Sequence, residues 1–395
     1  MEKNKLWSLQ FVLAVIIGTF SGIAFYIANP VLSKYIIQMG GSSAMAGFVV
    51  GLFSVTSLIA RPVSGFAADR VDKWLLWIGS TGIIALTSLA YFLCGNVYQI
   101  VFFRIFHGLA FAVSSTATIA VITDLVPVER LGEGIGFNSI SLVLASAVGP
   151  NLSVWIGEWM GLRYSFLAAF GILMVAIILM FFVFTSSRKG YQKKERGNLS
   201  LKEIRLDQIV SVRVLPIAIT NATFSFIVGI LSSFVLLFGE SRGITGISLY
   251  FTVYSCFLFL SRPLSGKLSD SRYGRYVYYP ALFLSIIGLT VLIFAYSLPG
   301  VLTAAVFLAL GIGSATPQLQ SFCIKILGKE KVGLATGTFY LGSDIGQGLG
   351  PMFAGVICGI FGYGVLFACC IGVLCIGCAI YTIFMRCVMK GEKNV

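Results

Sequence analysis

Twelve apolar runs, each long enough to cross a lipid bilayer, constrain this chain more than any other feature. A bilayer core about 30 Å thick requires roughly 20 apolar residues per helix. Glycine, proline and charged clusters separate the runs, which cover about residues 8–33, 44–66, 74–95, 98–123, 132–156, 162–186, 212–238, 246–266, 277–297, 300–324, 332–357 and 361–386. We therefore expect an all-α integral membrane protein with twelve transmembrane helices.

The composition excludes a soluble protein. Of the 395 residues, 57% are apolar and only 11% are charged, whereas an ordinary soluble domain is about one quarter charged. The mean hydropathy is +0.94. Nine cysteines lie in or beside apolar runs, and one histidine is too few for a histidine-based zinc site. We expect no disulfide framework, no metal and no cofactor.

The net charge of +13 fits either a nucleic-acid partner or basic loops on one side of a membrane. The distribution favours the membrane. In the predicted topology, 22 lysines and arginines lie on the side of the N-terminus, and only Lys34, Arg163 and Arg242 lie in loops on the opposite side. We therefore expect a multi-pass protein of the cell (inner, cytoplasmic) membrane, with both termini cytoplasmic and no nucleic-acid partner.

The sequence also repeats itself at an offset of 201 residues. The segment Arg61-Pro62-Val63-Ser64-Gly65 returns as Arg262-Pro263-Leu264-Ser265-Gly266, and Gly149-Pro150 returns as Gly350-Pro351. Two six-helix halves in the same orientation form a parallel repeat, which is a transporter architecture with a substrate path between the halves. We expect one bundle over residues 1–186, a cytoplasmic linker over 187–211 and a second bundle over 212–395.

Three motifs resemble those of the major facilitator superfamily. Between the second and third spans, Gly65-x-x-x-Asp69-Arg70 is similar to the family's loop signature, although Asp72 and Trp74 depart from it. The fourth span carries Arg104-x-x-His107-Gly108, with histidine where the family usually has glutamine. The fifth span has Gly136, Ala145, Gly149 and Pro150, which resembles the antiporter motif of the twelve-span drug:proton antiporter branch, with departures at Ala145, Ser153 and Val154.

This resemblance implies an inner gate built on the loop signature and its second copy. The gate residues would be Gly65, Asp69, Arg70, Asp124, Gly266, Asp270 and Arg275. Asp124, at the inner end of the fourth span, is the expected ion-pair partner of Arg70. The alternative is that these charges are solvated loop residues placed by the positive-inside rule.

Charges deep in the membrane cost several kcal/mol and point to function. Asp344 is the only acid deep in any span, and Gln347 shares its helix face. Arg104 and His107 lie one helical turn apart on one face. We expect these four residues to form a site for proton coupling or substrate charge. The alternative for Asp344 is an interhelical hydrogen bond.

The two repeated Gly-Pro pairs act on the helix backbone. Gly149-Pro150 and Gly350-Pro351 each remove a backbone hydrogen bond and permit a bend. Proline is common in membrane helices, so one pair alone would carry little weight. Their shared offset favours matched hinges or close-packing positions in the two halves.

We weigh two function classes for such a chain: a secondary transporter, and a membrane enzyme or non-transporting sensor. A membrane enzyme would need a nucleophile–base set or metal cluster, and a sensor would need a soluble output domain, and the sequence shows neither. We expect instead a secondary active transporter that moves a small organic molecule by alternating access as a monomer. Without a phosphate-binding loop, an ion gradient is the natural drive. The fifth-span motif favours proton-coupled efflux of a drug or a metabolite such as a metallophore, and proton-coupled uptake by symport is the alternative.

Overall fold

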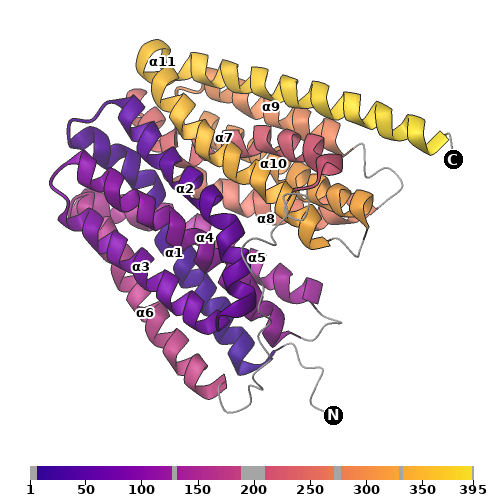
Figure 1. Ribbon diagram of the computed structural model, residues 1–395. Coiled ribbons are helices and arrows are strands. Elements are labelled where there is room, and N and C mark those ends of the chain that lie inside the picture. Colours follow the sequence, from indigo (N-terminus) through magenta and orange to yellow (C-terminus); the bar gives the residue numbers. More distant parts are fainter. Residues whose placement is uncertain (1–6, 127–130, 188–209, 271–276, 329–331, 394–395) are drawn as a thin grey trace. The chain divides into compact units, whose positions relative to one another are not determined.

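The computed structural model describes residues 7–126, 131–187, 210–270, 277–328 and 332–393. Over these ranges all regular structure is helical, as predicted (Figure 1). The α-helices are α1 (Leu9–Gln38), α2 (Ser43–Arg70), α3 (Lys73–Leu93), α4 (Val97–Leu125), α5 (Leu131–Trp159), α6 (Arg163–Ser187), α7 (Leu215–Ser241), α8 (Leu249–Asp270), α9 (Tyr278–Phe294), α10 (Leu298–Leu327) and α11 (Val332–Lys393), with a 3₁₀ turn η4 (Val212–Val214) before α7.

The prediction of twelve spans is confirmed, although only eleven α-helices are separate. Among the described residues nine helices are long and apolar enough to cross a membrane, and two further apolar helices are shorter. The helix α11 contains 62 residues and is interrupted at Gly362, where φ is 80°. Glycine adopts this left-handed conformation without steric cost, so the chain turns there and α11 supplies the last two spans. Gly161, 201 positions earlier, has φ of 106° between α5 and α6.

The chain divides into two compact units. The first contains Met1–Gly41 and Leu52–Leu199, and the second contains Ser42–Gly51 and Ser200–Val395. The first turns of α2 therefore group with the second unit. Most of the expected linker over 187–211 lies outside the described residues, so its boundaries stay a prediction.

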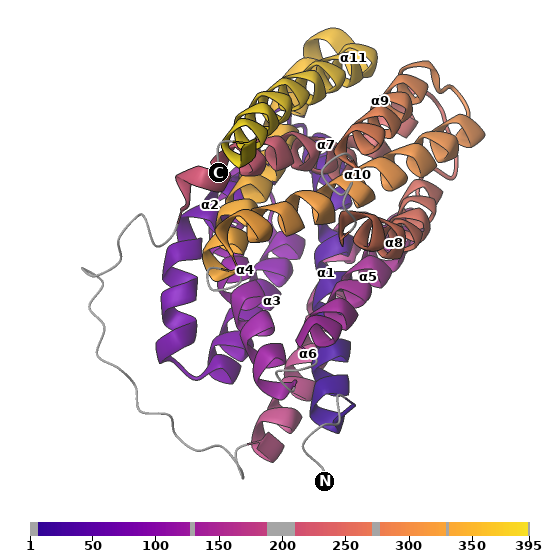
Figure 2. The ribbon, with the colours of Figure 1, turned by 90° about the vertical axis from the view of Figure 1, so that its right-hand side faces the viewer.

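Each unit is a helical bundle with its own pairings. In the first unit α1 packs against α5 and α6, and α3 packs against α4 and α6. In the second unit α7 packs along α11, and α10 lies beside α8 and α9 (Figure 2). A core cluster in the first unit, including Phe11, Trp77, Val121 and Met180, holds α1, α3, α4 and α6 together.

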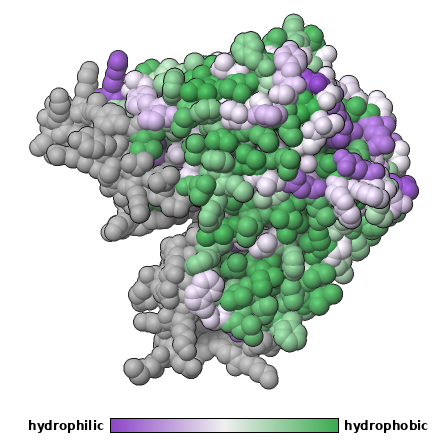
Figure 3. All heavy atoms as spheres, turned by 180° about the vertical axis from the view of Figure 1, so that it is seen from behind, coloured by the Kyte–Doolittle hydropathy of each residue, from purple (hydrophilic) through white to green (hydrophobic). Residues whose placement is uncertain are grey.

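The surface carries the signature of a membrane protein. Figure 3 shows a face on which apolar side chains predominate. On α6, Ile178 and Phe182 are 63% and 71% exposed. Such exposure would be unfavourable in water, but hydrocarbon solvates these side chains, and the α-helix satisfies its own backbone polar groups. Many serine and threonine hydroxyls bond to carbonyls of their own helix, as Thr118 does to Ser114.

Candidate functional site

A buried cluster of polar and aromatic side chains surrounds Arg104 and His107 in the first unit. The two residues lie one turn apart on α4, and their side chains are 1% and 2% exposed. A charged or ionisable side chain is rarely this buried unless specific partners hold it. The described contacts of the cluster come from α1, α2 and α3.

Arg104 is held from three directions. Its Nη2 donates to Asn29 Oδ1 on α1 at 2.9 Å. Its guanidinium carbon lies 4.6 Å from the centroid of the Phe53 ring on α2, which is a cation–π geometry. A side-chain hydrogen bond also joins it to Tyr91 on α3. Arginine keeps its charge in proteins, so these contacts position a fixed cation within the bundle.

His107 sits between the same two aromatic residues. Tyr91 Oη lies 3.2 Å from His107 Nδ1, a hydrogen bond in which either group can be the donor. The two rings also stack, with centroids 5.7 Å apart and an interplanar angle of 12°. Phe53 meets the imidazole edge-on at 5.5 Å. Tyr91 and Phe53 therefore connect Arg104 and His107 into one network.

Aromatic rings extend this network toward a more accessible surface. Phe53 packs against Phe111 with centroids 4.8 Å apart. Phe111 stacks on Phe25 at 5.0 Å with an interplanar angle of 23°. Phe25 and Phe111 are half-buried, whereas Phe53 is 6% exposed. We call Phe25, Phe53 and Phe111 the aromatic face. It offers rings for an apolar or aromatic molecule, with the Arg104 cation behind it.

Gly108 is what brings α4 so close to α2. A Cβ built at this position would overlap Thr56 Oγ1, and it would also lie 2.5 Å from the Phe53 carbonyl oxygen. Only glycine allows this approach, and small residues at helix interfaces do the same in other membrane bundles. The close approach places Phe53 between Arg104 and His107.

The predicted residues of the second unit lie on α11. Asp344 is half-buried and Gln347 is exposed. Beside Asp344, Ser343 accepts a 2.7 Å hydrogen bond from Asn221 Nδ2 on α7, and both of these side chains are buried. Asp344 therefore follows directly on a residue that ties α11 to α7.

Glycine also sets the distance between α7 and α11. Cβ atoms at Gly342, Gly346 and Gly350 would overlap the carbonyl oxygens of Ala218, Ala222 and Phe226, respectively. The repeated positions thus include close-packing sites. In the first unit a Cβ at Gly149 would lie 2.6 Å from the Tyr26 Cβ, between α5 and α1. Both α5 and α11 continue through Pro150 and Pro351, and a hinge at these prolines stays a prediction.

Asp124, near the C-terminal end of α4, has a partner that the sequence did not suggest. Lys73 Nζ, at the start of α3, donates to both carboxylate oxygens of Asp124 at 2.7 Å. The side chains of Asp69, Arg70 and Asp270 and the surroundings of Gly65 and Gly266 are not described, and Arg275 lies outside the described residues. The expected Arg70–Asp124 pair is therefore untested.

Sequence reasoning missed three members of the buried cluster, Asn29, Phe53 and Tyr91. Asn29 carried one usable signal, because it is an amide that directly precedes a proline within an apolar span. Phe53 and Tyr91 carried none, since aromatic residues are common throughout these helices. Only the packing of α1, α2 and α3 around α4 identifies them.

The profile of the Major Facilitator Superfamily matches residues 14–289 and 245–394, which together cover almost the whole chain. The chain belongs to the Major Facilitator Superfamily. Members are transporters, so this member of the superfamily is a secondary transporter of small molecules in a membrane and is not an enzyme.

Curated relatives of this superfamily member extend over nearly its full length. The multidrug resistance protein MdtG of Salmonella arizonae is 27% identical over 371 residues, covering 91% of each chain. The protein of the same name from Salmonella typhimurium has the same identity and coverage.

Solved structures agree on the fold. A POT family transporter in complex with 5-aminolevulinic acid matches with a TM-score of 0.81 at 12% identity, covering 95% of each chain. A bacterial homologue of the human lysosomal transporter Spinster, in an inward-facing and unoccupied conformation, matches with a TM-score of 0.74 at 16% identity. That match covers 96% of this chain and 97% of the other. At these identities the likeness establishes the fold alone.

Proposed function

We propose that this transporter is a proton-coupled exporter of small organic molecules across the cytoplasmic membrane. The observation that carries the proposal is the match over 91% of the chain to proteins named for multidrug resistance. The fifth-span motif, which is similar to that of proton antiporters, supports it independently. One chain carries both copies of the sequence repeat, which supports action as a monomer.

The aromatic face is the proposed contact for the substrate. Phe25 and Phe111 are half-buried and stacked, so a planar or apolar group can pack against them at little conformational cost. Arg104 lies behind Phe53 and is 1% exposed. In this structure it therefore acts on a substrate by positioning the Phe53 ring. Its positive charge favours molecules that carry an anionic group over simple lipophilic cations.

Asp344 is the proposed proton carrier. It is the only acid deep in any of the spans predicted from the sequence, and it is half-buried on α11 beside the Asn221–Ser343 hydrogen bond. Placing a charged carboxylate at this depth is costly, so proton binding changes the energetics of the site more than it would at a surface. In an exchange cycle, the acid would take up a proton from outside and release it to the cytoplasm as the substrate leaves.

The proposed orientation places both termini and the segment between the halves in the cytoplasm. It rests on the ratio of 22 basic loop residues on that side to three on the other. The ion pair of Lys73 with Asp124, at the inner ends of α3 and α4, would then lie at the cytoplasmic mouth.

Uptake by proton symport is the second candidate, because the fold serves both directions. Vesicles with an imposed pH gradient separate the two, whichever way the protein inserts. An antiporter accumulates substrate when the lumen is acidic, since protons leave as substrate enters. A symporter accumulates it when the outside is acidic. We expect accumulation with an acidic lumen, and accumulation only with an acidic exterior would overturn export. Suitable probes are a zwitterionic fluoroquinolone, an anionic aromatic carboxylate and a cationic dye.

A further inference from the structure

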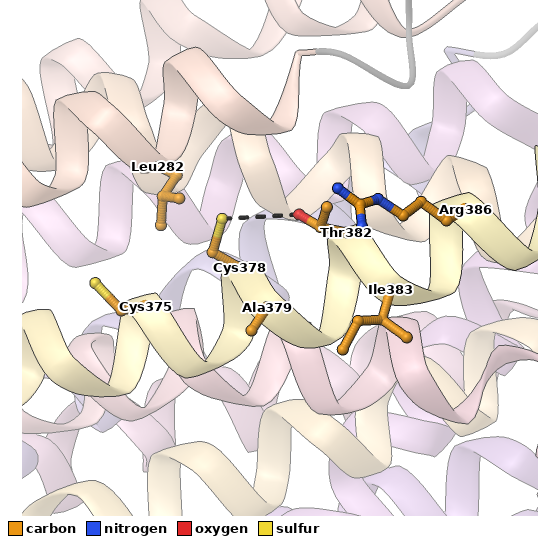
Figure 4. Close-up of a pocket in the computed structure, with 7 residues that line it drawn as sticks. All are labelled: Leu282, Cys375, Cys378, Ala379, Thr382, Ile383 and Arg386. Carbon is orange, nitrogen blue, oxygen red and sulfur yellow. Dashed lines mark hydrogen bonds between the residues drawn. The ribbon is translucent and has the colours of Figure 1, made fainter.

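A surface groove of the second unit lies between α9 and the last span of α11. It has a volume of about 400 Å³ and is lined by Leu282, Cys375, Cys378, Ala379, Thr382, Ile383 and Arg386. One residue comes from α9 and six from successive turns of α11 (Figure 4). The groove takes no part in the proposed transport site.

The polarity of the groove changes along its length. Leu282, Ala379 and Ile383 make apolar walls, with two thiols beside them. At the other end Figure 4 shows the Arg386 side chain pointing back along α11 toward Thr382. Within the described residues Arg386 is exposed and makes no hydrogen bond or ion pair. Its guanidinium therefore has donors available for an anion at one end of an apolar groove.

The length of the groove matches one leaflet of the bilayer. From Arg386 to Cys375 the helix rises about 16 Å, at 1.5 Å per residue. Half of the hydrocarbon core measures about 15 Å. Arg386 lies near the end of the last span, and Lys390 and Lys393 follow it on the same helix. The cation thus sits at headgroup depth, and the apolar walls reach toward the bilayer centre.

We propose that this groove binds a phospholipid with an anionic headgroup. The headgroup phosphate accepts hydrogen bonds from Arg386, and an acyl chain lies along Leu282, Ala379 and Ile383. Arg386 favours a net anionic headgroup, because in a zwitterionic headgroup an ammonium already offsets the phosphate charge. A guanidinium suits phosphate because its planar fork of donors matches two oxygens at once. Thr382, held by Tyr279 Oη at 3.2 Å, joins α11 to α9 between the two parts of the site. The lipid comes from the leaflet on the side of the C-terminus.

The test is native mass spectrometry of the full chain with equimolar phosphatidylglycerol and phosphatidylethanolamine that carry identical acyl chains. We expect the wild-type protein to retain phosphatidylglycerol preferentially. Arg386→Gln should reduce that retention about fivefold, which is the contribution of one basic side chain to binding at an anionic surface. Ala379→Trp, which fills the apolar part, should reduce retention of both lipids.

Two matched controls separate the groove from ordinary surrounding lipid. Arg213→Gln removes one exposed cation from the segment before α7, and Ile376→Trp places the same indole side chain at an exposed position of α11 outside the groove. Neither should change retention. The proposal is overturned if Arg386→Gln retains phosphatidylglycerol as the wild type does. Equal losses from Arg386→Gln and Arg213→Gln, or no preference between the two lipids, would overturn it too.

Discussion

Arg104 on α4 and Asn29 on α1 are joined by a 2.9 Å hydrogen bond inside the first unit. A bond between a guanidinium and an amide oxygen is charge-assisted, and burial away from water strengthens it. It connects the helix that carries the two predicted polar residues to the first span.

This bond predicts an energetic coupling between the two positions. In a double-mutant cycle of Arg104→Gln and Asn29→Ala, we expect a coupling free energy of about 1 kcal/mol in unfolding from mixed micelles. Thr118→Val replaces Asn29→Ala in the control cycle, because Thr118 bonds only to a carbonyl of its own helix in the described contacts. Strictly additive effects for Arg104 and Asn29 would show that the bond contributes nothing.

The contact of α11 with α7 predicts a difference between two glycines of the same helix. A Cβ at Gly346 would overlap the Ala222 carbonyl oxygen, whereas a Cβ at Gly372 meets nothing within 4 Å. Gly346→Ala should therefore lower the free energy of unfolding by about 1–3 kcal/mol, the usual cost of overpacking. Gly372→Ala should leave it unchanged or raise it. Thermal unfolding in detergent measures both, and equal melting temperatures would contradict the packing described.

The ion pair of Lys73 with Asp124 predicts a loss of transport that exceeds the loss of stability. The two side chains are 27% and 40% exposed, so the pair contributes only about 0.2–1 kcal/mol to folding. If the pair holds the inner gate, Lys73→Gln and Asp124→Asn should each reduce the transport rate severalfold. The exchange of both residues, Lys73→Asp with Asp124→Lys, should restore much of it. Glu158 is an exposed acid near the C-terminal end of α5. Glu158→Gln should have no effect on transport, and a similar loss there would show that the Lys73–Asp124 pair has no specific role as a gate.

The proposed orientation predicts one-sided labelling of single cysteines in a cysteine-free background. Ser42, between α1 and α2, is the expected outer site. It is preferred to its neighbour Gly41, where a Cβ would lie 2.7 Å from the Ile36 side chain. A membrane-impermeant maleimide applied to intact cells should label Ser42→Cys and fail to label Ser187→Cys. Permeabilised cells should label both positions. Labelling of Ser187→Cys in intact cells would reverse the topology.

The sequence was sufficient to predict where the helices lie, because bilayer thickness dictates their length. The span predicted over 98–123 is α4, Val97–Leu125, and the glycines that turn the chain at 161 and 362 are separated by 201 residues, the offset of the sequence repeat. Contacts between helices were harder to predict, because they depend on side-chain packing that no pattern along the sequence encodes. Tyr91 is one tyrosine among 16, yet it bonds to both His107 and Arg104. Lys73 reaches Asp124 because α3 and α4 pack along each other and only a short turn joins them, which brings the start of α3 beside the end of α4.

The proposed exchange cycle depends on Asp344 as the proton carrier. Its most direct test is substrate accumulation in vesicles with an acidic lumen, measured for the wild-type protein and Asp344→Asn at matched amounts of folded protein. We predict that the wild type concentrates the substrate and releases protons in step with it, as a pH-sensitive dye reports. Asp344→Asn should still bind the substrate but neither concentrate it nor move protons. Accumulation by Asp344→Asn at the wild-type rate, with the same proton release, would contradict the claim and return His107, Asp69 and Asp124 as candidates.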